Sequence, residues 1–467
     1  MIRSEETICA PATAIGGAIA VIRVSGSHSI NICDKIFIPL DKSTKLIDQK
    51  GFTIVFGDIC FGDEIIDEVL VSVFRAPHSY TGENSVEISC HASVYIIKRI
   101  LKMLIESGAV AARPGEFTQR AFLNGRIDLS QAEAVADVIA STSSSAHRLA
   151  MNQMRGGFSS EISKLRSELL NFASLIELEL DFGEEDVEFA DRNELKTIIL
   201  NVKDLADRMA MSFLLGNVVK NGIPVVIVGK PNTGKSTLLN ALLMDEKAIV
   251  SEIPGTTRDT IEDTIVIDGI EYRFIDTAGL RETSDIIESL GIKKTHEKIN
   301  QASVILLVDE ISDQAESVNE SADALREIIA GSVKQLFLLI NKIDQASPVR
   351  QLEVQEQIRL LPGETLLFIS AKEKTGLDDL RKRLGEVIAK EKLNTDDVII
   401  TNIRHYESLM NVSESLDRVL SGLHNNIPED FIAIDIRQAI HYLGEITGEI
   451  TSDEILGNIF KNFCIGK

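Results

Sequence analysis

The segment GKPNTGKS, residues 229–236, has the residue types and spacing that bind phosphate groups. It matches the pattern GxxxxGK[ST] and lies between an apolar stretch and a helical one, as this loop requires. The glycines let backbone N–H groups close around phosphates, while Lys235 reaches the β and γ phosphates and Ser236 ligates Mg²⁺. The segment therefore predicts a nucleotide-binding loop.

Two further segments supply groups for the metal and the γ phosphate. The segment DTAG follows a predicted strand, so we expect Asp276 to hold Mg²⁺ through a water and the Gly279 N–H to meet the γ phosphate. The segment GTTRD places Thr257 at the usual distance for a switch segment that closes on Mg²⁺ when the γ phosphate is present. We therefore expect Thr257 and Ser236 to be the Mg²⁺ ligands from the protein.

The segment NKID, residues 341–344, matches NKxD and predicts a guanine site. Asp344 is expected to accept two hydrogen bonds from guanine N1 and N2, while Lys342 packs along the base. Adenine would leave the carboxylate unpaired and desolvated, so the pattern favours GTP over ATP. The later SAK segment, residues 370–372, completes the base pocket through its backbone.

Together these motifs predict one set of nucleotide contacts. We expect GTP to contact Asn232, Thr233, Gly234, Lys235, Ser236, Thr237, Ser251, Glu252, Ile253, Pro254, Gly255, Thr256, Thr257, Asp276, Thr277, Ala278, Gly279, Asn341, Lys342, Asp344, Ser370, Ala371 and Lys372.

Leu280 follows directly after the DTAG segment. In Ras-like proteins a glutamine in this position orients the attacking water, but a leucine side chain cannot form hydrogen bonds. Another group must therefore orient the water.

Strands that alternate with helices position these groups. From residue 221 to about 390, apolar runs at 225–228, 273–275, 304–308 and 336–340 are each followed by a helical stretch, which predicts a parallel sheet with helices on both faces.

Two other kinds of sequence flank this region. Residues 1–118 alternate β-rich runs with one helical stretch and predict an α+β module, whereas residues 119–217 and 391–467 have helical periodicity. The simplest organisation is an α/β domain, 218–390, inserted into one helical domain. Periodicity alone also allows two unrelated helical pieces.

Composition bounds the remaining possibilities. A length of 467 residues suggests about three domains. No apolar run approaches the ~18 residues of a membrane span, and no secretory signal is evident, so we predict a cytoplasmic protein without a membrane role. The net charge of −23 repels nucleic-acid backbones, so any contact with RNA must be local or shared with a partner.

Three motifs outside the nucleotide site extend the interpretation to the whole chain. They are AVIRVSG at 20–26, FLNGRIDLSQAEA at 122–134 and FCIGK at 463–467. With these motifs the sequence resembles the MnmE (TrmE) family of bacterial tRNA modification GTPases. The resemblance implies an N-terminal α+β folate-binding-like domain, a helical domain, and a Ras-like P-loop GTPase domain inserted into the helical domain.

The resemblance also implies how GTP is hydrolysed. The GTPases of this family are activated by K⁺ and by dimerisation of their G domains, so K⁺ would be held by Asn232, Ser251, Ile253 and Thr256. The catalytic glutamate of the family corresponds to Glu288, which would orient the water through a bridging water. From the residues alone, Glu288 is an ordinary surface residue of a helix.

A folate site is implied in the N-terminal domain. The resemblance assigns 5,10-methylene- or 5-formyl-tetrahydrofolate to Arg23, Glu87, Arg126 and Lys467, near the C-terminal tail. Cys464 in that tail is either a flexible nucleophile or a packed apolar side chain. The sequence departs from the family pattern at residues 11–17. It departs again at residues 92–93, which are alanine and serine, whereas the family commonly has two glycines after the preceding histidine.

The implied reaction adds an aminomethyl or carboxymethylaminomethyl group to C5 of the wobble uridine, position 34, of certain tRNAs. The implied assembly is a homodimer that joins an FAD- and NADH-using MnmG-like partner in a heterotetramer or larger complex. A ribosome-assembly or regulatory GTPase without modification chemistry is the main alternative. A further alternative is that residues 1–118 form a dimerisation module that binds no folate.

Overall fold

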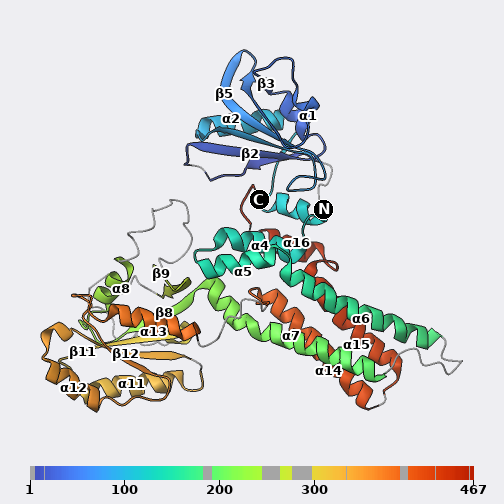
Figure 1. Ribbon diagram of the computed structural model, residues 1–467. Helices are drawn as coiled ribbons and strands as arrows, with labels where there is room; N and C mark the ends of the chain where they lie inside the picture. Colours follow the sequence, from blue (N-terminus) through green and yellow to red (C-terminus); the bar gives the residue numbers. More distant parts are fainter. Residues whose placement is uncertain are drawn as a thin grey trace. The chain divides into compact units, whose positions relative to one another are not determined.

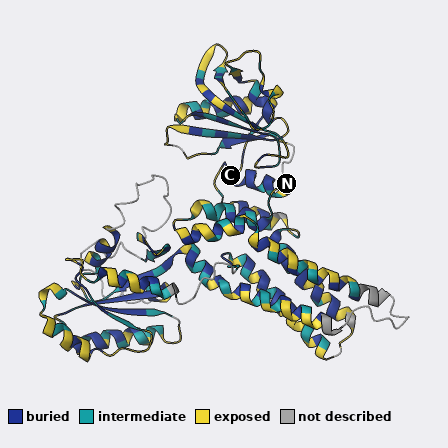
Figure 2. Cartoon of the chain, viewed as in Figure 1, coloured by how far each residue is buried: buried dark blue, intermediate teal, exposed yellow. Residues whose placement is uncertain are grey.

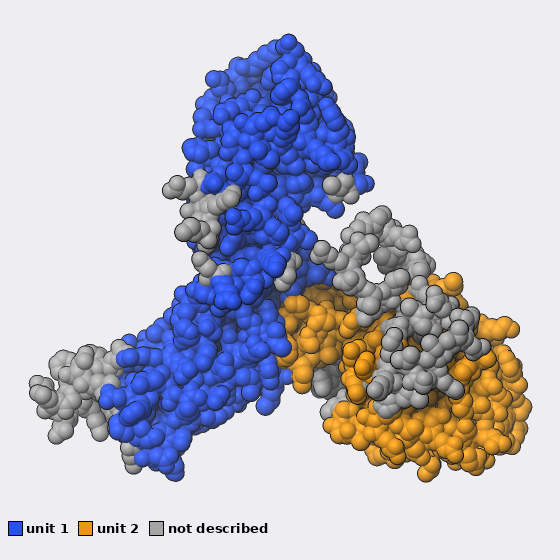
Figure 3. All heavy atoms as spheres, turned by 180° about the vertical axis from the view of Figure 1, so that it is seen from behind, with its two compact units in different colours: residues 1–140, 150–211, 402–467 blue, residues 141–149, 212–401 orange. Residues whose placement is uncertain are grey.

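The computed structural model describes residues 6–14, 16–181, 192–244, 263–275, 297–332, 334–389, 398–425, 427–461 and 463–466. The chain forms two compact units, which Figure 3 colours separately. Unit 1 contains residues 1–140, 150–211 and 402–467, and unit 2 contains residues 141–149 and 212–401.

Unit 1 begins with a seven-stranded sheet in the order β3-β4-β5-β6-β2-β1-β7. The pairs are antiparallel except for β1 with β7. The strands are β1 (Ile8–Pro11), β2 (Ile19–Ser25), β3 (Phe37–Pro39), β4 (Thr53–Phe61), β5 (Glu64–Phe74), β6 (Ser85–His91) and β7 (Val110–Ala111).

Two helices, α1 (Ser29–Asp34) and α2 (Val94–Glu106), supply apolar side chains to the core on one face of this sheet. Alternate residues of β2 point into that core, among them Ile22 and Val24, because successive side chains of a strand face opposite sides. The sequence predicted an α+β module with a helical stretch in residues 1–118, and the sheet with α2 confirms this prediction.

The rest of unit 1 is helical, and its helices come from both sides of unit 2 in the sequence. Helix α15 packs against both α14 and α6, as Figure 1 shows. The helices are α3 (Glu116–Leu123), α4 (Leu129–Ala140), α5 (Ser144–Met154), α6 (Gly157–Asp181), α7 (Arg192–Asn221), α14 (Ile403–His424), α15 (Glu429–Thr447) and α16 (Asp453–Lys461), of which α5 and α7 extend into unit 2. The alternative of two unrelated helical pieces is therefore wrong.

Unit 2 contains a six-stranded sheet in the order β13-β12-β11-β8-β10-β9. All neighbours pair in parallel except β9 with β10, so the predicted parallel sheet carries one antiparallel strand at its edge. The strands are β8 (Ile223–Val228), β9 (Asp263–Ile267), β10 (Ile270–Phe274), β11 (Val304–Glu310), β12 (Gln335–Asn341) and β13 (Thr365–Phe368).

Helices cover both faces of this sheet, so its central strands are apolar on both sides. They are α8 (Lys235–Met244), α11 (Ala315–Ile329), α12 (Pro348–Gln357) and α13 (Leu377–Ala389). In β11, Leu306 packs into the core under α8 and α13, while Leu307 packs into the core under α11. Figure 2 shows the buried strands and the exposed outer surfaces of α11 and α12.

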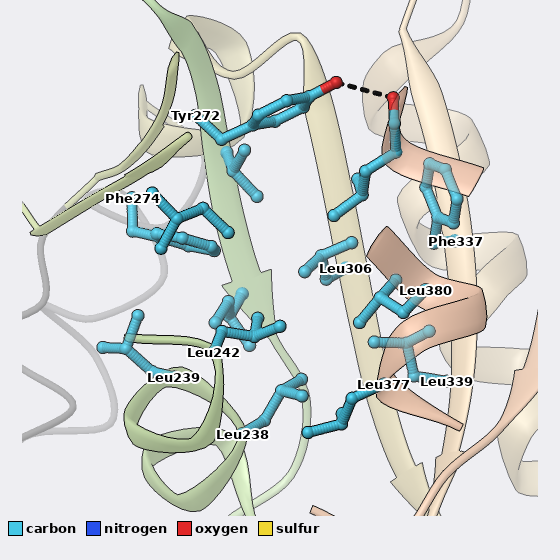
Figure 4. Packing of buried hydrophobic residues seen from close by; sticks show 14 of the residues in the cluster. Leu238, Leu239, Leu242, Tyr272, Phe274, Leu306, Phe337, Leu339, Leu377 and Leu380 are labelled. Atoms are coloured by element: carbon cyan, nitrogen blue, oxygen red, sulfur yellow. Dashed lines mark hydrogen bonds between the residues drawn. The ribbon is translucent and has the colours of Figure 1, made fainter. Parts of the chain in front are cut away.

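The core beneath α8 and α13 contains the buried hydroxyl of Tyr272 (Figure 4). This hydroxyl donates a hydrogen bond of 2.6 Å to the carbonyl oxygen of Leu384, which ties β10 to α13. Burial raises the pKa of Tyr272, so the hydroxyl remains a donor.

The fold class predicted from the sequence is thus confirmed, with an α/β domain inserted into a helical one. The finer division at residues 118, 217 and 390 stays a prediction. In the part of the chain that the structure describes, no helix is long and apolar enough to cross a membrane.

Candidate nucleotide and folate sites

The phosphate loop connects β8 to α8 in unit 2. The backbone of Gly229 has a φ of 147°, and a Cβ there would lie 2.1 Å from the Val308 carbonyl oxygen. Only glycine therefore allows the loop to pass so close to β11. The loop ends where α8 begins at Lys235, so Ser236 and Thr237 occupy the first turn of that helix.

The loop folds around the side chain of Lys235. Its ammonium donates to the carbonyl oxygens of Gly229 at 2.9 Å and Lys230 at 2.5 Å. The buried Thr233 hydroxyl donates to the same Lys230 carbonyl at 3.0 Å. Burial lowers the pKa of Lys235, and the negative charge of Asp309 opposes this effect.

Asn341 joins the phosphate loop to the base-binding segments. Its Nδ2 donates to the carbonyl oxygen of Thr233 at 2.8 Å, and its Oδ1 accepts from the Ala371 backbone N–H at 2.9 Å. The side chain is buried at the end of β12. One amide therefore connects three of the predicted segments.

The predicted guanine-binding residues lie together beside this amide. The exposed Asp344 accepts a hydrogen bond of 2.6 Å from the Ser370 hydroxyl, which orients the carboxylate. Lys342 has a left-handed backbone, with a φ of 62°, and its ammonium is paired with Glu310. Lys372 is exposed and lies 3.6 Å from the carboxylate of Glu373.

Asp309 is a buried carboxylate that lies outside the motifs predicted from the sequence. Neither of its carboxylate oxygens has a hydrogen-bond partner among the described residues, and the side chain is buried at the end of β11. Burial raises its pKa to about 6; the positive charge of Lys230 opposes this rise, Asp313 adds to it, and Lys235 also opposes it. An acidic residue directly after the apolar run 304–308 was the available sequence signal.

Part of the predicted site lies outside the described residues. Its members are Ser251, Glu252, Ile253, Pro254, Gly255, Thr256, Thr257, Asp276, Thr277, Ala278, Gly279, Leu280 and Glu288, so their roles stay predictions. Of the predicted K⁺ ligands, only Asn232 is described. It is exposed in the phosphate loop, with a φ of 65°.

The predicted folate residues in unit 1 form a second polar site. Arg23 on β2 and Glu87 on β6 are directly opposite in register, and the Arg23 Nε donates to the glutamate at 2.9 Å. The guanidinium lies over the Tyr80 ring, 5.1 Å from its centroid, and 5.6 Å from the centroid of Phe117. A cation, a carboxylate and aromatic faces are thus brought together.

The C-terminal tail contacts the same site. The Gly466 carbonyl oxygen lies 3.5 Å from the Arg23 Nη1, and the Cys464 carbonyl accepts from the Gly115 N–H at 3.3 Å. Gly466 has a φ of 97°, and a Cβ there would lie 2.0 Å from the carbonyl oxygen of Pro11. The Cys464 side chain is exposed, and Lys467 lies outside the described residues.

A cavity of about 260 Å³ opens beside these residues. It is lined by Phe52, Phe74, His78, Ser79, Tyr80 and Arg126. Tyr80 thus belongs both to the cavity and to the surface beneath Arg23, which links Arg126 to the other predicted folate residues. Aromatic rings and a guanidinium are suited to a flat heterocycle with a carboxylate tail.

Unit 2 combines a parallel sheet, a glycine-rich loop after β8, an NKxD segment after β12 and an SAK segment after β13. This arrangement defines a P-loop nucleotide-binding protein of the guanine-specific class. The particular family follows from comparisons with known proteins.

Two family models match nearly all of the chain. The model of the MnmE helical domain matches residues 129–464, and the model of the GTP-binding protein TrmE N-terminus matches residues 7–126. The chain belongs to the MnmE family, and the resemblance stated from its motifs is confirmed.

Curated relatives match along their whole length. The tRNA modification GTPase MnmE of Bacteroides thetaiotaomicron is 52% identical over 466 residues, covering 99% of this chain and 100% of the relative. The protein of the same name from Flavobacterium psychrophilum is 52% identical over 464 residues, covering 99% of each. A solved GTP-binding protein from Sulfolobus solfataricus, in complex with GDP, is 19% identical, covers 49% of this chain and 68% of its own, and has a TM-score of 0.27; the family assignment does not depend on it.

Proposed function

We propose that the chain is a GTP hydrolase that acts in tRNA modification. The observation that carries the proposal is the Asn341 side chain, which joins the phosphate loop to the base-binding segments beside an oriented Asp344. The full-length relatives named tRNA modification GTPases support the second half of the proposal.

The described residues fit the phosphates and base of GTP. Backbone N–H groups of the loop bind the phosphates, and the Lys235 ammonium exchanges the carbonyls of Gly229 and Lys230 for phosphate oxygens. Asp344 accepts from the guanine edge and thereby excludes adenine. Mg²⁺, held by Ser236 and Thr257 and by Asp276 through a water, would neutralise charge on the β and γ phosphates.

We further propose that K⁺ takes the place of an arginine finger and that Glu288 takes over the role of the missing water-orienting glutamine. Asn232, Ser251, Ile253 and Thr256 would hold the ion, which would offset charge on the phosphates. Glu288 would orient the attacking water through a second water. Hydrolysis rates in K⁺ and Na⁺, and the rate of Glu288→Ala, test this mechanism; equal rates in both salts or an unimpaired variant would refute it.

The polar site of unit 1 is proposed to bind a one-carbon tetrahydrofolate. Arg23, Glu87 and Arg126, with Lys467 of the tail, would recognise the pterin ring and the glutamate tail, and the folate would supply the one-carbon unit. The aromatic and cationic lining of the adjacent cavity supports this assignment. Titration of the full-length protein with 5-formyl-tetrahydrofolate tests it, and absence of binding would refute it.

The uridine chemistry is proposed to require a second protein. An MnmG-like partner with FAD and NADH would join the chain to add an aminomethyl or carboxymethylaminomethyl group to C5 of uridine 34 in the cytoplasm. The net charge of −23 supports this division, since a partner can provide most contacts to the tRNA backbone. GTP hydrolysis would drive rearrangement of the domains rather than enter the chemistry at uridine.

A homodimer is proposed through the open face of the N-terminal sheet. Ile54, Phe56 and Leu70 are 68%, 45% and 47% exposed, and Phe56 is opposite Leu70 in register. A contiguous apolar surface of this kind is typical of an interface.

Mass spectrometry of wobble nucleosides tests the function as a whole. We expect tRNA from cells that lack the gene to carry unmodified uridine 34, and reintroduction of the gene to restore the modified nucleoside. Normal modification without the gene would instead favour a ribosome-assembly or regulatory GTPase.

A further inference from the structure

Glu310 ends strand β11 beside the segment predicted to bind guanine. It is in register with Asn341, the last residue of β12, and the next N–H, that of Ile311, donates to the Asn341 carbonyl at 3.0 Å. Lys342 follows Asn341 directly. The sheet therefore fixes the backbone of Glu310 next to the backbone of the lysine.

The side chains of Glu310 and Lys342 are also joined. The Lys342 ammonium is paired with Oε2 of Glu310, and the Ser312 hydroxyl donates to Oε1 at 2.5 Å. The backbone N–H of Glu310 donates to Asp313 at 3.2 Å, which closes the turn after β11. Both carboxylate oxygens are therefore occupied, and one of them holds the lysine.

The two ends of Lys342 are thus restrained. At the backbone, its left-handed conformation is followed by a short 3₁₀ turn, Ile343–Gln345, whose last N–H donates to the Lys342 carbonyl at 3.0 Å. At the ammonium, the pair with Glu310 is only partly exposed: the two side chains are 30% and 27% accessible. The hydrogen bond from Lys342 is the main cause of the lowered pKa of Glu310, which keeps the carboxylate ionised.

We propose that Glu310 is a positioning residue for guanine nucleotides, acting through Lys342. It holds the aliphatic stem of the lysine in place as one wall of the base pocket. The proposal rests on the proposed GTP site and names a residue outside its sequence motifs. Ser370 orients Asp344 in the same manner, through a hydrogen bond. The edge of the base would thus meet an oriented Asp344, and its face would meet an oriented Lys342.

The physical gain is entropic. A free lysine side chain populates many rotamers, and fixing it at the moment of binding lowers the affinity. A lysine that is already held by a carboxylate avoids most of that cost. Glu310 should therefore strengthen binding of GDP and GTP alike, and it should not change the chemical step, because it lies at the base and not at the γ phosphate.

The test measures binding of a fluorescent GDP analogue and steady-state GTP hydrolysis by full-length Glu310→Gln. We expect the Kd for the analogue and the KM for GTP to rise about 3- to 10-fold, the range expected for losing one pre-ordered side chain, with kcat unchanged. The effect should shrink at high salt, because the pair is partly exposed. Glu353→Gln, which breaks an exposed pair with Arg350 on α12, is the matched control and should bind normally.

A double variant separates positioning from a general effect on the fold. In a Lys342→Ala background, Glu310→Gln should cause no further loss of affinity. An equal loss in that background would overturn the proposal, as would unchanged binding by the single variant. Tighter binding would also overturn it, since Glu310 would then compete with the nucleotide for the ammonium. Wild-type protein that binds no analogue would refute the GTP site itself.

Discussion

Asp344 is the residue on which the proposed preference for guanine depends. It is exposed and held at one oxygen by Ser370, so its other oxygen remains accessible to a ligand. Replacing Asp344 by Asn replaces one of the two carboxylate oxygens, which would accept from guanine N1 and N2, by an amide NH₂ group that donates. We expect the ratio of kcat/KM for GTP over ATP to fall by at least about 100-fold. Hydrolysis assays with both nucleotides measure the ratio.

Ser370→Ala is the matched variant for this prediction. It leaves the Asp344 carboxylate in place and removes only the hydroxyl that orients it, so the preference should fall far less. An Asp344→Asn enzyme with an unchanged preference for GTP over ATP would show that this carboxylate does not recognise guanine.

Asp309 should contribute a destabilising effect to the nucleotide-free protein that is present at neutral pH and absent at acidic pH. Its pKa is raised from 3.8 to about 6, so the folded state disfavours the ionised form. The destabilising effect begins as the pH rises above about 4 and is complete above about 6. Asp309→Asn should therefore raise the free energy of unfolding of nucleotide-free protein by about 1–2 kcal/mol at pH 7.5 and hardly change it at pH 4.

Calorimetric unfolding at the two pH values tests this expectation. Asp378→Asn, at a fully exposed position in the first turn of α13, serves as the control and should show no stabilisation at either pH. A stabilisation of Asp309→Asn that is the same at pH 4 and pH 7.5 would rule out titration as the cause.

The sequence predicted the site residues that belong to contiguous motifs. It did not predict Asp309 or Glu310, because neither lies in a recognisable spacing. Glu310 acts across the sheet on Lys342, which is distant in sequence, and the raised pKa of Asp309 depends mainly on burial that only the fold creates. The bridging geometry of Asn341 was also absent from the sequence, since it depends on the register of β12 beside the phosphate loop.

At the scale of elements, a buried ion cluster joins the helices that precede and follow unit 2. Glu133 on α4 accepts from Arg404 of α14 at 3.0 and 2.9 Å, and the Nε2 of His405 lies 2.7 Å from the same carboxylate. Arg404 also donates to the carbonyl of Glu445 on α15 at 2.6 Å. The cluster therefore fixes the start of α14, where the chain returns to unit 1.

Glu133→Gln should destabilise unit 1. Burial raises the pKa of Glu133, but the charges and hydrogen bonds of His405 and Arg404 outweigh it and lower the pKa to about 2. The stabilising contribution is thus complete above about pH 4.5 and is lost as the pH falls toward 2. Removing one charge of a buried cluster should lower the free energy of unfolding by about 3 kcal/mol at pH 7.

Urea unfolding followed by circular dichroism at pH 7 and pH 3 measures this loss. Glu414→Gln, which breaks an exposed pair with Arg418 on α14, should have little effect. If the destabilisation by Glu133→Gln were as large at pH 3 as at pH 7, the lowered pKa would not be its cause.

The elements themselves were largely predictable, because periodicity and strand-helix alternation reflect burial of apolar faces. Two features were not predicted. The antiparallel β9 pairs with β10 across a two-residue turn at Asp268 and Gly269, and this Asp-Gly pair between two short β-rich runs was an available hairpin signal that the prediction of a parallel sheet left out. The membership of residues 141–149 in unit 2 depends on contacts such as the Ser145 N–H to the Gly269 carbonyl, at 3.1 Å, which helical periodicity does not reveal.

At the scale of the whole molecule, the open face of the N-terminal sheet and the net charge constrain association together. A charge of −23 opposes self-association, so a stable dimer needs an apolar surface with few charges. Ile54, Phe56 and Leu70 provide such a surface on neighbouring strands, whereas the opposite face of the sheet is filled by α1 and α2.

Phe56→Glu should therefore convert the proposed dimer into a monomer. The substitution places a charge opposite Leu70 without entering the core, so the chain should remain folded while the interface loses its apolar centre. Sedimentation velocity measures the oligomeric state, and circular dichroism checks the fold. Val349→Glu, at an even more accessible apolar position on α12, should leave the dimer intact. A Phe56→Glu protein that still sediments as a dimer would place the interface on another surface.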